Sequence, residues 1–479
     1  MKPVAETARE LDYDYGHMTL GECIRVAEET RMSVGEVILR EAVDSTGLTG
    51  EQVAASMEEA FAHNLCAAGI GATTGRSFLL GAVGQDLAAE DGAKIAGDPF
   101  VDRIVTYTLA AQVGNHTIGL CPCAGTGDAC PYTGFVKAVK EFYTDKDLIT
   151  RVMAVILKIG GIFRVGKRTT GCNMEGIGAG AAASAAAFVE LAGGTPAQME
   201  RAVVLAISPT ISVPCTPRVL VPGLCATHIG GGILIARLAS QLAMHTSIPS
   251  TVPVDVMIAM AAQCHLASAK HVVPVTIEYM EPFFKHDERV EAYIDPAVRE
   301  AEKLRQEELI VRAAAESREL ARRANPITKP FAEAVVGGSS QGVGSPTNCG
   351  RIAHFLSEGR IKKVKIELYS ELFARRAINV PGILMAAVDG AGTSDADAYR
   401  EILAEVRRRG IEVEILEVDE PSVQRVTIEA EKQNSMVDSL NRGGARLVLR
   451  DASPSVERAR EIAEELNICL LYTSDAADD

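Results

Sequence analysis

Residues 176–191 limit the possible folds of this chain more than any other stretch, because they are almost all Ala, Gly or larger apolar residues. A helix that is apolar on every side is either buried or spans a membrane. This stretch is too short for a span and contains Glu190, so it predicts a tightly packed central helix. Its small side chains let neighbouring helices approach closely, which suits a cofactor site between them.

Capping signals mark the starts of several predicted helices. Residues 195–198 place a Thr before Pro and a Gln two residues later, the pattern of an N-cap, a first helical residue and a capping-box partner. Residues 33–36 and 49–52 also fit the capping box. We therefore expect short helices over residues 1–62 and a mostly helical domain over residues 63–285.

The composition changes after residue 285. Residues 286–330 are rich in Glu, Arg, Lys and Ala, which predicts a solvated helical connector or an arm against a partner subunit. Residues 331–468 predict a small α/β domain with helices at 396–409 and 455–467. Its predicted strands contain Val364, Ile366 and Leu368; Ile411, Val413 and Ile415; Val426 and Ile428; and Leu447 and Leu449. The expected fold class is α plus α/β, a large helical catalytic domain followed by a small α/β domain.

Composition and charge exclude several classes of protein. Of the 479 residues, 47% are hydrophobic, so the chain is too apolar to be disordered. The net charge of −15 leaves no excess of Lys and Arg for phosphates, so we expect no nucleic-acid partner. The N-terminus lacks a secretion signal and no stretch predicts a membrane span, so a cytoplasmic location is expected.

The last residues, 469–479, read as translated sequencing-adapter DNA. They include Cys469, which is therefore left out of the cysteine argument. We expect the natural protein to continue beyond the helix that this tail interrupts.

The chain contains 11 cysteines, and a cytosolic chain keeps its thiols reduced. Clustered cysteines in such a chain indicate metal binding or catalysis rather than disulfides. Scattered cysteines are more often small buried hydrophobes, which is the expectation for Cys23, Cys66 and Cys264. Cys349 has no assigned role.

Three cysteines, Cys172, Cys215 and Cys225, lie in Gly- and Pro-rich surroundings, separated by 43 and then 10 residues. The chain has no Cys-x-x-Cys, which argues against a zinc ribbon and a ferredoxin-type run. The neighbouring turn residues predict positions at helix ends or in loops, where thiolates can converge. Three thiolates fit a four-iron cluster with one iron left open, and an open iron can act as a Lewis acid on a substrate oxygen.

The sequence around these cysteines is similar to that of a known enzyme family. The segment Gly171-Cys172-Asn173-Met174-Glu175 resembles the Gly-Cys-Gln-Ala-Glu of the iron–sulfur-dependent bacterial L-serine dehydratases. Residues 190–198 resemble the family's Glu-Val-Leu-Gly-Gly-Thr-Pro-Glu-Gln, and Cys215 and Cys225 stand where it has Cys-Asp-Pro and Val-Pro-Cys. The resemblance to the family's α domain covers about residues 100–275, and it implies that Cys172, Cys215 and Cys225 hold a [4Fe-4S] cluster.

Two further patches extend the resemblance. Residues 122–131 resemble a Gly-rich loop that lies near the substrate in the family, which implies substrate binding by Gly125 and Thr126. Exposed N–H groups of such a loop can hold a carboxylate. Residues 338–345 resemble the Ser-Ser-His-Thr motif of the family's β domain, which implies a role for Ser339 and Ser340. An ordinary tight turn and a Gly/Ser linker are the alternatives for these two patches.

The chain also departs from the family. Gln341 and Gly342 replace the family's His and Thr, which leaves the substrate open. The loop carries extra thiols that could supply an alternative ligand or cap the open iron: Cys121, Cys123 and Cys130.

Other polar side chains lie close to the cysteine motifs. Asp128 and Glu175 are candidate general bases because of this proximity. His116 and His228 also lie near these motifs, although a lone His is more often structural. Lys167 and Arg168 could pair with a substrate carboxylate, or form a solvated basic turn.

These observations predict an iron–sulfur-dependent lyase that converts L-serine or a related small hydroxy amino acid into a 2-keto acid and ammonia. The alternatives are a desulfidase-type lyase acting on cysteine, and a redox or sensor protein without lyase activity. The expected partners are a small amino-acid substrate and a second copy of the chain in a homodimer, without nucleic acid or membrane.

Overall fold

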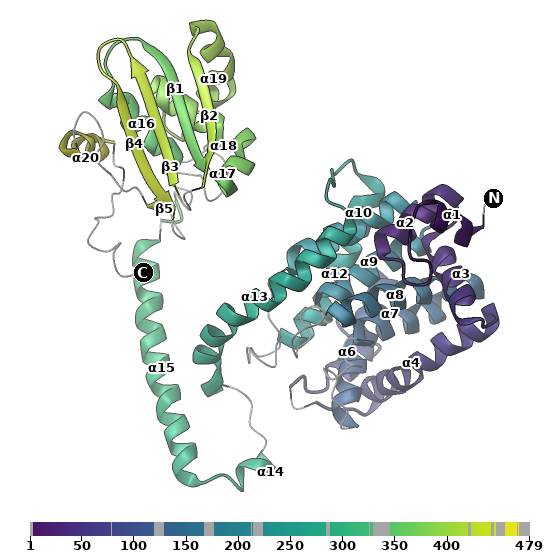
Figure 1. The fold of residues 1–479 in the computed structure, drawn as a ribbon. Helices are drawn as coiled ribbons and strands as arrows, with labels where there is room; N and C mark the ends of the chain where they lie inside the picture. Colours follow the sequence, from purple (N-terminus) through teal and green to yellow (C-terminus); the bar gives the residue numbers. More distant parts are fainter. Residues whose placement is uncertain are drawn as a thin grey trace. The chain divides into compact units, whose positions relative to one another are not determined.

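The computed structural model describes residues 3–77, 79–118, 129–166, 177–211, 213, 224–283, 288–324, 326–328, 345–419, 423–441, 445–446, 456–466 and 468. The chain divides into two compact units, Met1–Ala314 and Ala315–Asp479, and each is described by itself. The first is built from helices and the second combines helices with a sheet (Figure 1), which confirms the expected fold class. The border between the units falls within the long charged helix at residues 296–323. The finer division into residues 1–62, 63–285, 286–330 and 331–468 stays a prediction.

The first unit contains the chain's longest run of helices. Its helices are α1 (Val4–Glu10), α2 (Leu20–Thr30), α3 (Val34–Thr46), α4 (Gly50–Thr73), α5 (Val83–Ala88), α6 (Pro99–Thr117), α7 (Ala129–Phe142), α8 (Lys146–Gly166), α9 (Ala179–Leu191), α10 (Pro196–Ile207), η3 (Ser208–Thr210), α12 (Leu224–His245), α13 (Val254–Met280), η4 (Glu281–Phe283), α14 (Glu288–Glu291) and α15 (Pro296–Arg323), which continues into the second unit.

The predicted capping signals form at two of the three expected helix starts. Thr195 and Thr49 each cap a helix in a complete capping box, with Gln198 and Gln52 as their partners. At the start of α3 the Ser33 hydroxyl accepts the N–H of Glu36 at 3.2 Å, but the reciprocal bond is replaced. The Glu36 carboxylate instead pairs with Arg40 one turn later at 2.9 Å, so this predicted capping box was wrong in its second half.

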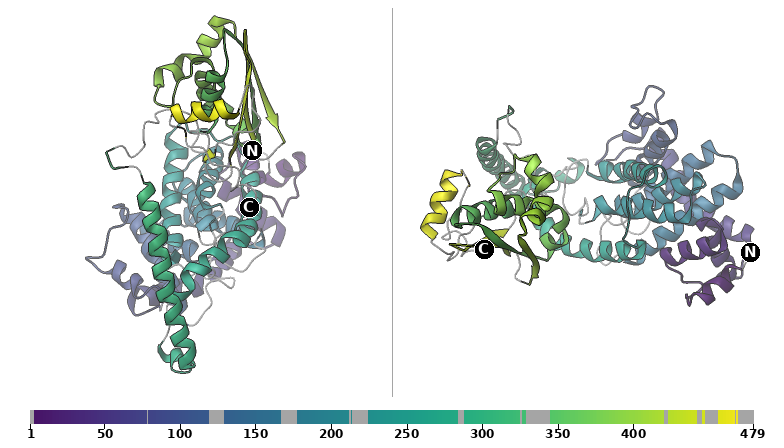
Figure 2. Two further views of the ribbon diagram at one scale, coloured as in Figure 1. Left: turned by 90° about the vertical axis from the view of Figure 1, so that its left-hand side faces the viewer. Right: turned by 90° about the horizontal axis from the view of Figure 1, so that it is seen from above.

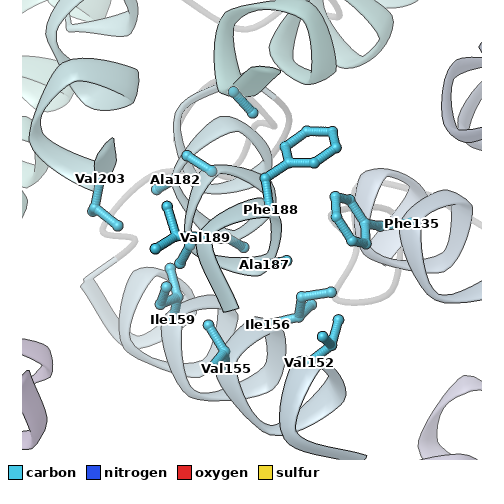
Figure 3. Close-up of a cluster of buried hydrophobic side chains, with 14 of the residues drawn as sticks. Phe135, Val152, Val155, Ile156, Ile159, Ala182, Ala187, Phe188, Val189 and Val203 are labelled. Carbon is cyan, nitrogen blue, oxygen red and sulfur yellow. The ribbon is translucent and has the colours of Figure 1, made fainter. Parts of the chain in front are cut away.

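Helix α9 is the predicted central helix, and every residue from Ala179 to Glu190 is buried. Apolar side chains of α7, α8 and α10 surround it (Figure 3), and the Phe135 and Phe188 rings meet edge to face at 4.8 Å. Glu190 is buried but paired, because its carboxylate accepts the Arg151 Nε–H at 3.1 Å and the Gly35 N–H at 3.3 Å. This pairing explains how an ionisable residue is tolerated in an apolar helix.

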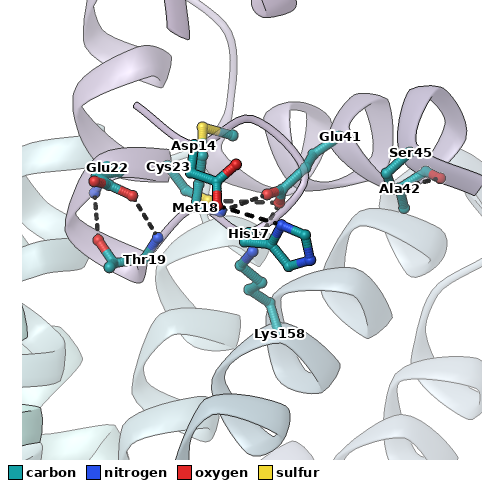
Figure 4. Close-up of polar contacts among 10 residues, drawn as sticks. All are labelled: Asp14, His17, Met18, Thr19, Glu22, Cys23, Glu41, Ala42, Ser45 and Lys158. Atoms are coloured by element: carbon teal, nitrogen blue, oxygen red, sulfur yellow. Dashed lines mark hydrogen bonds and ion pairs between the residues drawn. The ribbon is translucent and has the colours of Figure 1, made fainter. Parts of the chain in front are cut away.

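A second buried ion pair ties the N-terminal helices to α8 (Figure 4). The Lys158 ammonium lies 2.8 Å from one Glu41 oxygen, and the Met18 backbone N–H donates to the other oxygen at 2.9 Å. The Cys23 thiol lies 3.9 Å from the Lys158-bound oxygen, and burial raises the pKa of this thiol to about 12. Cys23 is therefore an un-ionised buried thiol, as predicted from the sequence.

The second unit has a five-stranded sheet in the order β2-β1-β3-β4-β5, with helices packed on one face (Figures 1 and 2). β1 pairs with β2 in parallel and with β3 antiparallel, and β3, β4 and β5 are antiparallel. Its further elements are α16 (Ser345–Leu356), β1 (Ile361–Tyr369), α17 (Ser370–Ala374), α18 (Arg376–Asp389), α19 (Ala396–Arg409), β2 (Glu412–Val418), β3 (Val423–Ala430), β4 (Ser435–Asn441), β5 (Ala445–Arg446) and α20 (Val456–Glu465).

The core of the second unit follows the predicted alternation. Val364 and Ile366 of β1 pair with Ile428 and Val426 of β3, and all four side chains are buried. Helix α19 spans the predicted residues 396–409. The predicted strand containing Leu447 and Leu449 lies outside the described residues.

One described segment of the first unit, Val254–Phe283, is long and apolar enough to cross a membrane by length and composition. No membrane span was expected from the sequence. Core helices meet the same criterion, so the feature alone does not indicate a membrane.

Candidate active site

Most of the predicted site residues lie outside the described residues. They are Cys172, Cys215, Gly125, Thr126, Asp128, Glu175, Ser339 and Ser340, together with Cys121, Cys123, Lys167, Arg168, Gln341 and Gly342. Cys225 lies in the first turn of α12, where the backbone is described. The surroundings of the predicted cluster site are therefore described through the helices on either side of residues 119–128, 167–176 and 214–223.

The directions of α8, α9, α10 and α12 follow from polar contacts near their ends. Arg151 near the start of α8 pairs with Glu190 near the end of α9, so these helices are antiparallel. Residues 192–195 connect α9 directly to α10. The Arg201 guanidinium in α10 donates to the Ala243 carbonyl near the end of α12, at 3.4 Å. The end of α8, the start of α9, the end of α10 and the start of α12 therefore point toward the same end of the bundle.

Helices α6 and α7 reach the same end. Asp98 before α6 pairs with Arg237 of α12 at 3.2 Å, and Leu109 further along α6 lies beside Gly230 of α12. The two helices are thus antiparallel, and α6 ends where α12 begins. The Cys130 thiol, in the first turn of α7, contacts Gln112 near the end of α6. All six helix ends therefore point toward the same side of the bundle, and we call this side the loop end.

The loop end is where three connecting segments join the described helices. Residues 119–128 join α6 to α7, residues 167–176 join α8 to α9, and residues 214–223 precede α12. These segments, with the first turn of α12, contain all three cysteines of the predicted cluster. The fold therefore brings together the attachment points of motifs that lie far apart in the sequence.

A hydrogen-bonded chain of polar side chains lies at the loop end. The Cys130 thiol donates to Gln112 Oε1 at 3.2 Å, and Gln112 Nε2 lies 3.0 Å from His116 Nε2. His116 Nδ1 lies 2.6 Å from the Ser77 hydroxyl. With the Gln112 amide as placed, a proton on Nδ1 satisfies each contact, because Nε2 then accepts from Gln112 and Nδ1 donates to Ser77.

Burial keeps His116 neutral, because it lowers the pKa of the imidazole below its usual value. The neutral ring uses both nitrogens in the chain from Cys130 to Ser77. This arrangement fixes the last turn of α6 against the first turn of α7, and so anchors both ends of residues 119–128. These contacts favour a structural role for His116.

Glycines allow α4 to touch α6 near the loop end. A Cβ atom built on Gly71 would lie 1.8 Å from the Ala110 carbonyl oxygen, and one on Gly114 would lie 1.8 Å from the Ala67 carbonyl oxygen. Only a residue without a Cβ fits such contacts between backbones. The neighbouring Asn115 Nδ2 donates to Asn64 Oδ1 at 3.1 Å, so the close approach also brings two buried amides together.

His228 lies in the second turn of α12, and its side chain is buried, with 8% of its surface exposed. Burial lowers the pKa of this imidazole to about 4, so it is neutral near pH 7. A neutral imidazole has one donor and one acceptor nitrogen, both suited to hydrogen bonds with a small polar ligand.

The described cysteines outside the cluster motifs are free thiols: Cys23, Cys66, Cys130, Cys264 and Cys349. Cys66 is exposed, so its predicted burial was wrong, and Cys264 is only half-buried. Cys66 belongs to α4, where periodicity alone does not show which face the bundle covers. Cys130 is fully buried and bonded to Gln112, which favours packing over the ligand or capping roles considered for it.

Several residues of the loop end were missed in the sequence: Ser77, Asn64, Gln112 and Asn115. The available signal was the appearance of Gln112 and Asn115 inside an otherwise apolar helix. Within the described ranges no group of three or more His, Cys, Asp or Glu side chains could hold a metal ion. The predicted ligands Cys172 and Cys215 lie outside those ranges.

Comparison with known proteins gives consistent matches. The family profile described as "Serine dehydratase alpha chain" matches residues 27–272. The chain is 26% identical over 254 residues to "Probable L-serine dehydratase, alpha chain" of Bacillus subtilis (strain 168), covering 50% of this chain and 82% of that protein. It is 28% identical over 192 residues to "L-serine dehydratase TdcG" of Escherichia coli (strain K12), covering 37% and 40% of the two chains. It is 29% identical over 183 residues to "L-serine dehydratase, alpha chain" of Peptoniphilus asaccharolyticus, covering 36% and 61%.

The matched residues contain the loop end and all six helices that form it. The helical bundle and these matches define a lyase of the serine dehydratase type. The chain belongs to the serine dehydratase alpha chain family, which confirms the resemblance seen in its cysteine motifs.

Proposed function

We propose that this lyase is iron–sulfur-dependent and that it deaminates L-serine, or a related small hydroxy amino acid, to a 2-keto acid and ammonia. The observation that carries the proposal is that six helices point the ends that flank the three cysteine motifs toward one side of the bundle. The names of the relatives, each an L-serine dehydratase at 26–29% identity, support the substrate.

The proposed ligands of the cluster are Cys172, Cys215 and Cys225, and their positions in the chain support this. Cys225 lies in the first turn of a long helix, where the helix dipole favours a thiolate. Cys172 precedes the described Ile177 by five residues, and Cys215 follows Ile211 by four. Such segments reach at most about 18 Å, a length that is compatible with ligands meeting on this side of the bundle.

The cluster would supply a Lewis acid that helps the β-hydroxyl of the substrate to leave. A base of the chain, for which Asp128 and Glu175 are the candidates, removes the α-proton. Loss of water gives an enamine, and hydrolysis of its imine tautomer releases the 2-keto acid and ammonia. Gly125 and Thr126 of the Gly-rich segment, with Ser339 and Ser340, are proposed to bind the substrate. A cytoplasmic homodimer stays a prediction of the sequence.

The proposal is tested by reconstituting the full chain with iron and sulfide under anaerobic conditions. 2-Keto acid is then measured with L-serine, L-threonine and L-cysteine in turn. Formation of a keto acid from a hydroxy amino acid supports the proposal. A product from L-cysteine alone would indicate the desulfidase alternative, and an intact cluster without turnover of any of the three would indicate the redox or sensor alternative.

A further inference from the structure

Helix α13 carries an apolar face that is exposed in the structure. The opposite face of this helix is buried, and the helix packs against α2, α8 and α10 of the same unit. Along the exposed face, 52% of the surface of Val256, 40% of that of Met260 and 41% of that of Leu266 are accessible. We call the exposed residues of this side the α13 face: Val256, Ala259, Met260, Gln263, Leu266, Ala267 and Lys270.

The composition of the α13 face indicates a protein partner. Between Asp255 and Lys270 the helix contains no Asp, Glu, Lys or Arg. Contiguous exposed apolar residues on a folded protein mark interaction surfaces. A bilayer around the helix is disfavoured, because its other side packs against α2, which carries charged side chains such as Arg25 and Glu28.

The α13 face is nearly symmetric about Gln263. The residues at three, four and seven positions before and after Gln263 are Met260 and Leu266, Ala259 and Ala267, and Val256 and Lys270. Each of these spacings keeps a residue on one side of an α-helix. A twofold axis at Gln263 would therefore bring two copies of the face together with their helices antiparallel, which is the self-complementary contact of a symmetric dimer.

Two copies paired in this way are complementary in shape. At 3.6 residues per turn, Met260 and Ala267 lie along one edge of the face, and Ala259 and Leu266 lie along the other. Antiparallel pairing sets Met260 of one copy against Ala267 of the other, and Leu266 against Ala259. Each large side chain thus meets a small one, which lets the two helices approach closely.

The two copies are also complementary in charge. Asp255 lies at the start of the face, where its carboxylate accepts the Thr19 hydroxyl at 2.6 Å and the Gly21 N–H at 3.1 Å. Lys270 lies 15 residues later, about 22 Å along the helix. Antiparallel pairing brings Lys270 of each copy to Asp255 of the other, whereas parallel pairing would bring like charges together.

We propose that the α13 face is the interface of a twofold-symmetric homodimer, in which two α13 helices pack antiparallel across an axis at Gln263. This assignment gives a surface and a symmetry to the homodimer expected from the sequence. It does not depend on the proposed lyase activity.

Sedimentation velocity of the full chain tests the interface, and the wild type is expected at twice the mass of one chain. Met260→Arg and Leu266→Arg each place two charges in a twofold interface, so each should raise the dimer dissociation constant at least hundredfold. Leu403→Arg is the matched control, because Leu403 is a 50% exposed apolar residue of α19 in the second unit, and it should leave the dissociation constant unchanged. Far-UV circular dichroism verifies that each variant is folded.

A pair of variants with opposite charges tests the antiparallel arrangement. Met260→Glu and Ala267→Lys should each weaken self-association, because each places its charge against an apolar side chain twice. An equimolar mixture of the two should form a dimer at least tenfold tighter than either variant alone, since the new carboxylate of one chain then meets the new ammonium of the other. A mixture that associates no better than its components would overturn the antiparallel pairing.

A monomeric wild type would overturn the interface, and so would folded Met260→Arg and Leu266→Arg chains that dimerise as tightly as the wild type. A monomeric wild type that floats with phosphatidylcholine vesicles would assign the α13 face to a lipid surface instead. Keto acid formation is assayed separately, so loss of the dimer and loss of the proposed lyase function are distinguished.

Discussion

Replacing Gly71 with Ala is expected to destabilise the first unit, whereas the same replacement at Gly69, two residues earlier in α4, is expected to stabilise it. A Cβ atom on Gly71 would lie 1.8 Å from the Ala110 carbonyl oxygen and 2.6 Å from its carbon, where ordinary contacts begin at 3.4 Å. A Cβ atom on Gly69 has no neighbour within 4 Å. Both variants therefore add the same methyl group, and they differ only in whether that group has room.

The magnitude follows from two opposing effects. Ala is favoured over Gly in a helix by about 1 kcal/mol, and this gain applies to both variants. Overpacking costs typically about 1–3 kcal/mol, and the upper value is appropriate at Gly71 because the opposing atoms belong to a helix backbone and cannot rotate away. Gly71→Ala should therefore lose about 2 kcal/mol in the free energy of unfolding, and Gly69→Ala should gain up to about 1 kcal/mol.

Urea denaturation of the full chain, followed by far-UV circular dichroism, measures both variants against the wild type. The midpoint should fall for Gly71→Ala and rise slightly for Gly69→Ala, with similar slopes. Equal stability of the two variants would refute the backbone contact between α4 and α6. It would also remove the structural reason for the close approach of Asn64 and Asn115.

Three further predictions concern buried polar groups. Glu41→Gln should lower the free energy of unfolding by about 3 kcal/mol, because it leaves the Lys158 ammonium without its carboxylate, and adding Lys158→Met should recover most of this loss in urea denaturation. A cost below about 1 kcal/mol for Glu41→Gln would mean that the pair is not buried as described. Cys130→Ala should cost about 1–3 kcal/mol, because Gln112 Oε1 loses its donor, and Cys130→Ser should cost less; thermal melts that rank the two in the reverse order would contradict the hydrogen bond. The pKa of His228 falls from 6.5 to about 4 on folding, so the unfolded chain binds more protons between these values and stability should fall as the pH drops through this window, by on the order of 2 kcal/mol. Denaturation midpoints measured across that range should be less pH-dependent for His228→Gln, and an unchanged pH dependence would contradict the burial of the imidazole.

The sequence predicted those parts of the fold in which one side chain pattern dominates. Helix α9 could be identified because residues 179–189 are apolar or small on every side, and β1 because Val364, Ile366 and Leu368 alternate with polar residues. Strand β4 was missed, although it pairs with both β3 and β5. Its buried Asp438 pairs with Arg425 of the neighbouring strand at 2.6 Å. Because a charged residue is buried in this strand, the alternation of polar and apolar residues does not identify it.

In the candidate site, too, the sequence identified only residues that a local pattern marks. The three cysteines could be selected because Gly and Pro surround each of them and a family resemblance orders them. Gln112 and Asn115 could not be selected, because their partners come from α4 and α7 and depend on how those helices are oriented. Spacing within one helix contains no information about such contacts.

Iron content per chain, measured after anaerobic reconstitution and desalting, tests the central claim of an iron–sulfur lyase most directly. Cys172→Ala, Cys215→Ala and Cys225→Ala are compared with Cys66→Ala, the removal of an exposed free thiol of α4. The account predicts about four iron atoms with broad visible absorbance in the wild type and in Cys66→Ala, and loss of both in each of the other three variants. Retention of a full complement of iron in all three would contradict it.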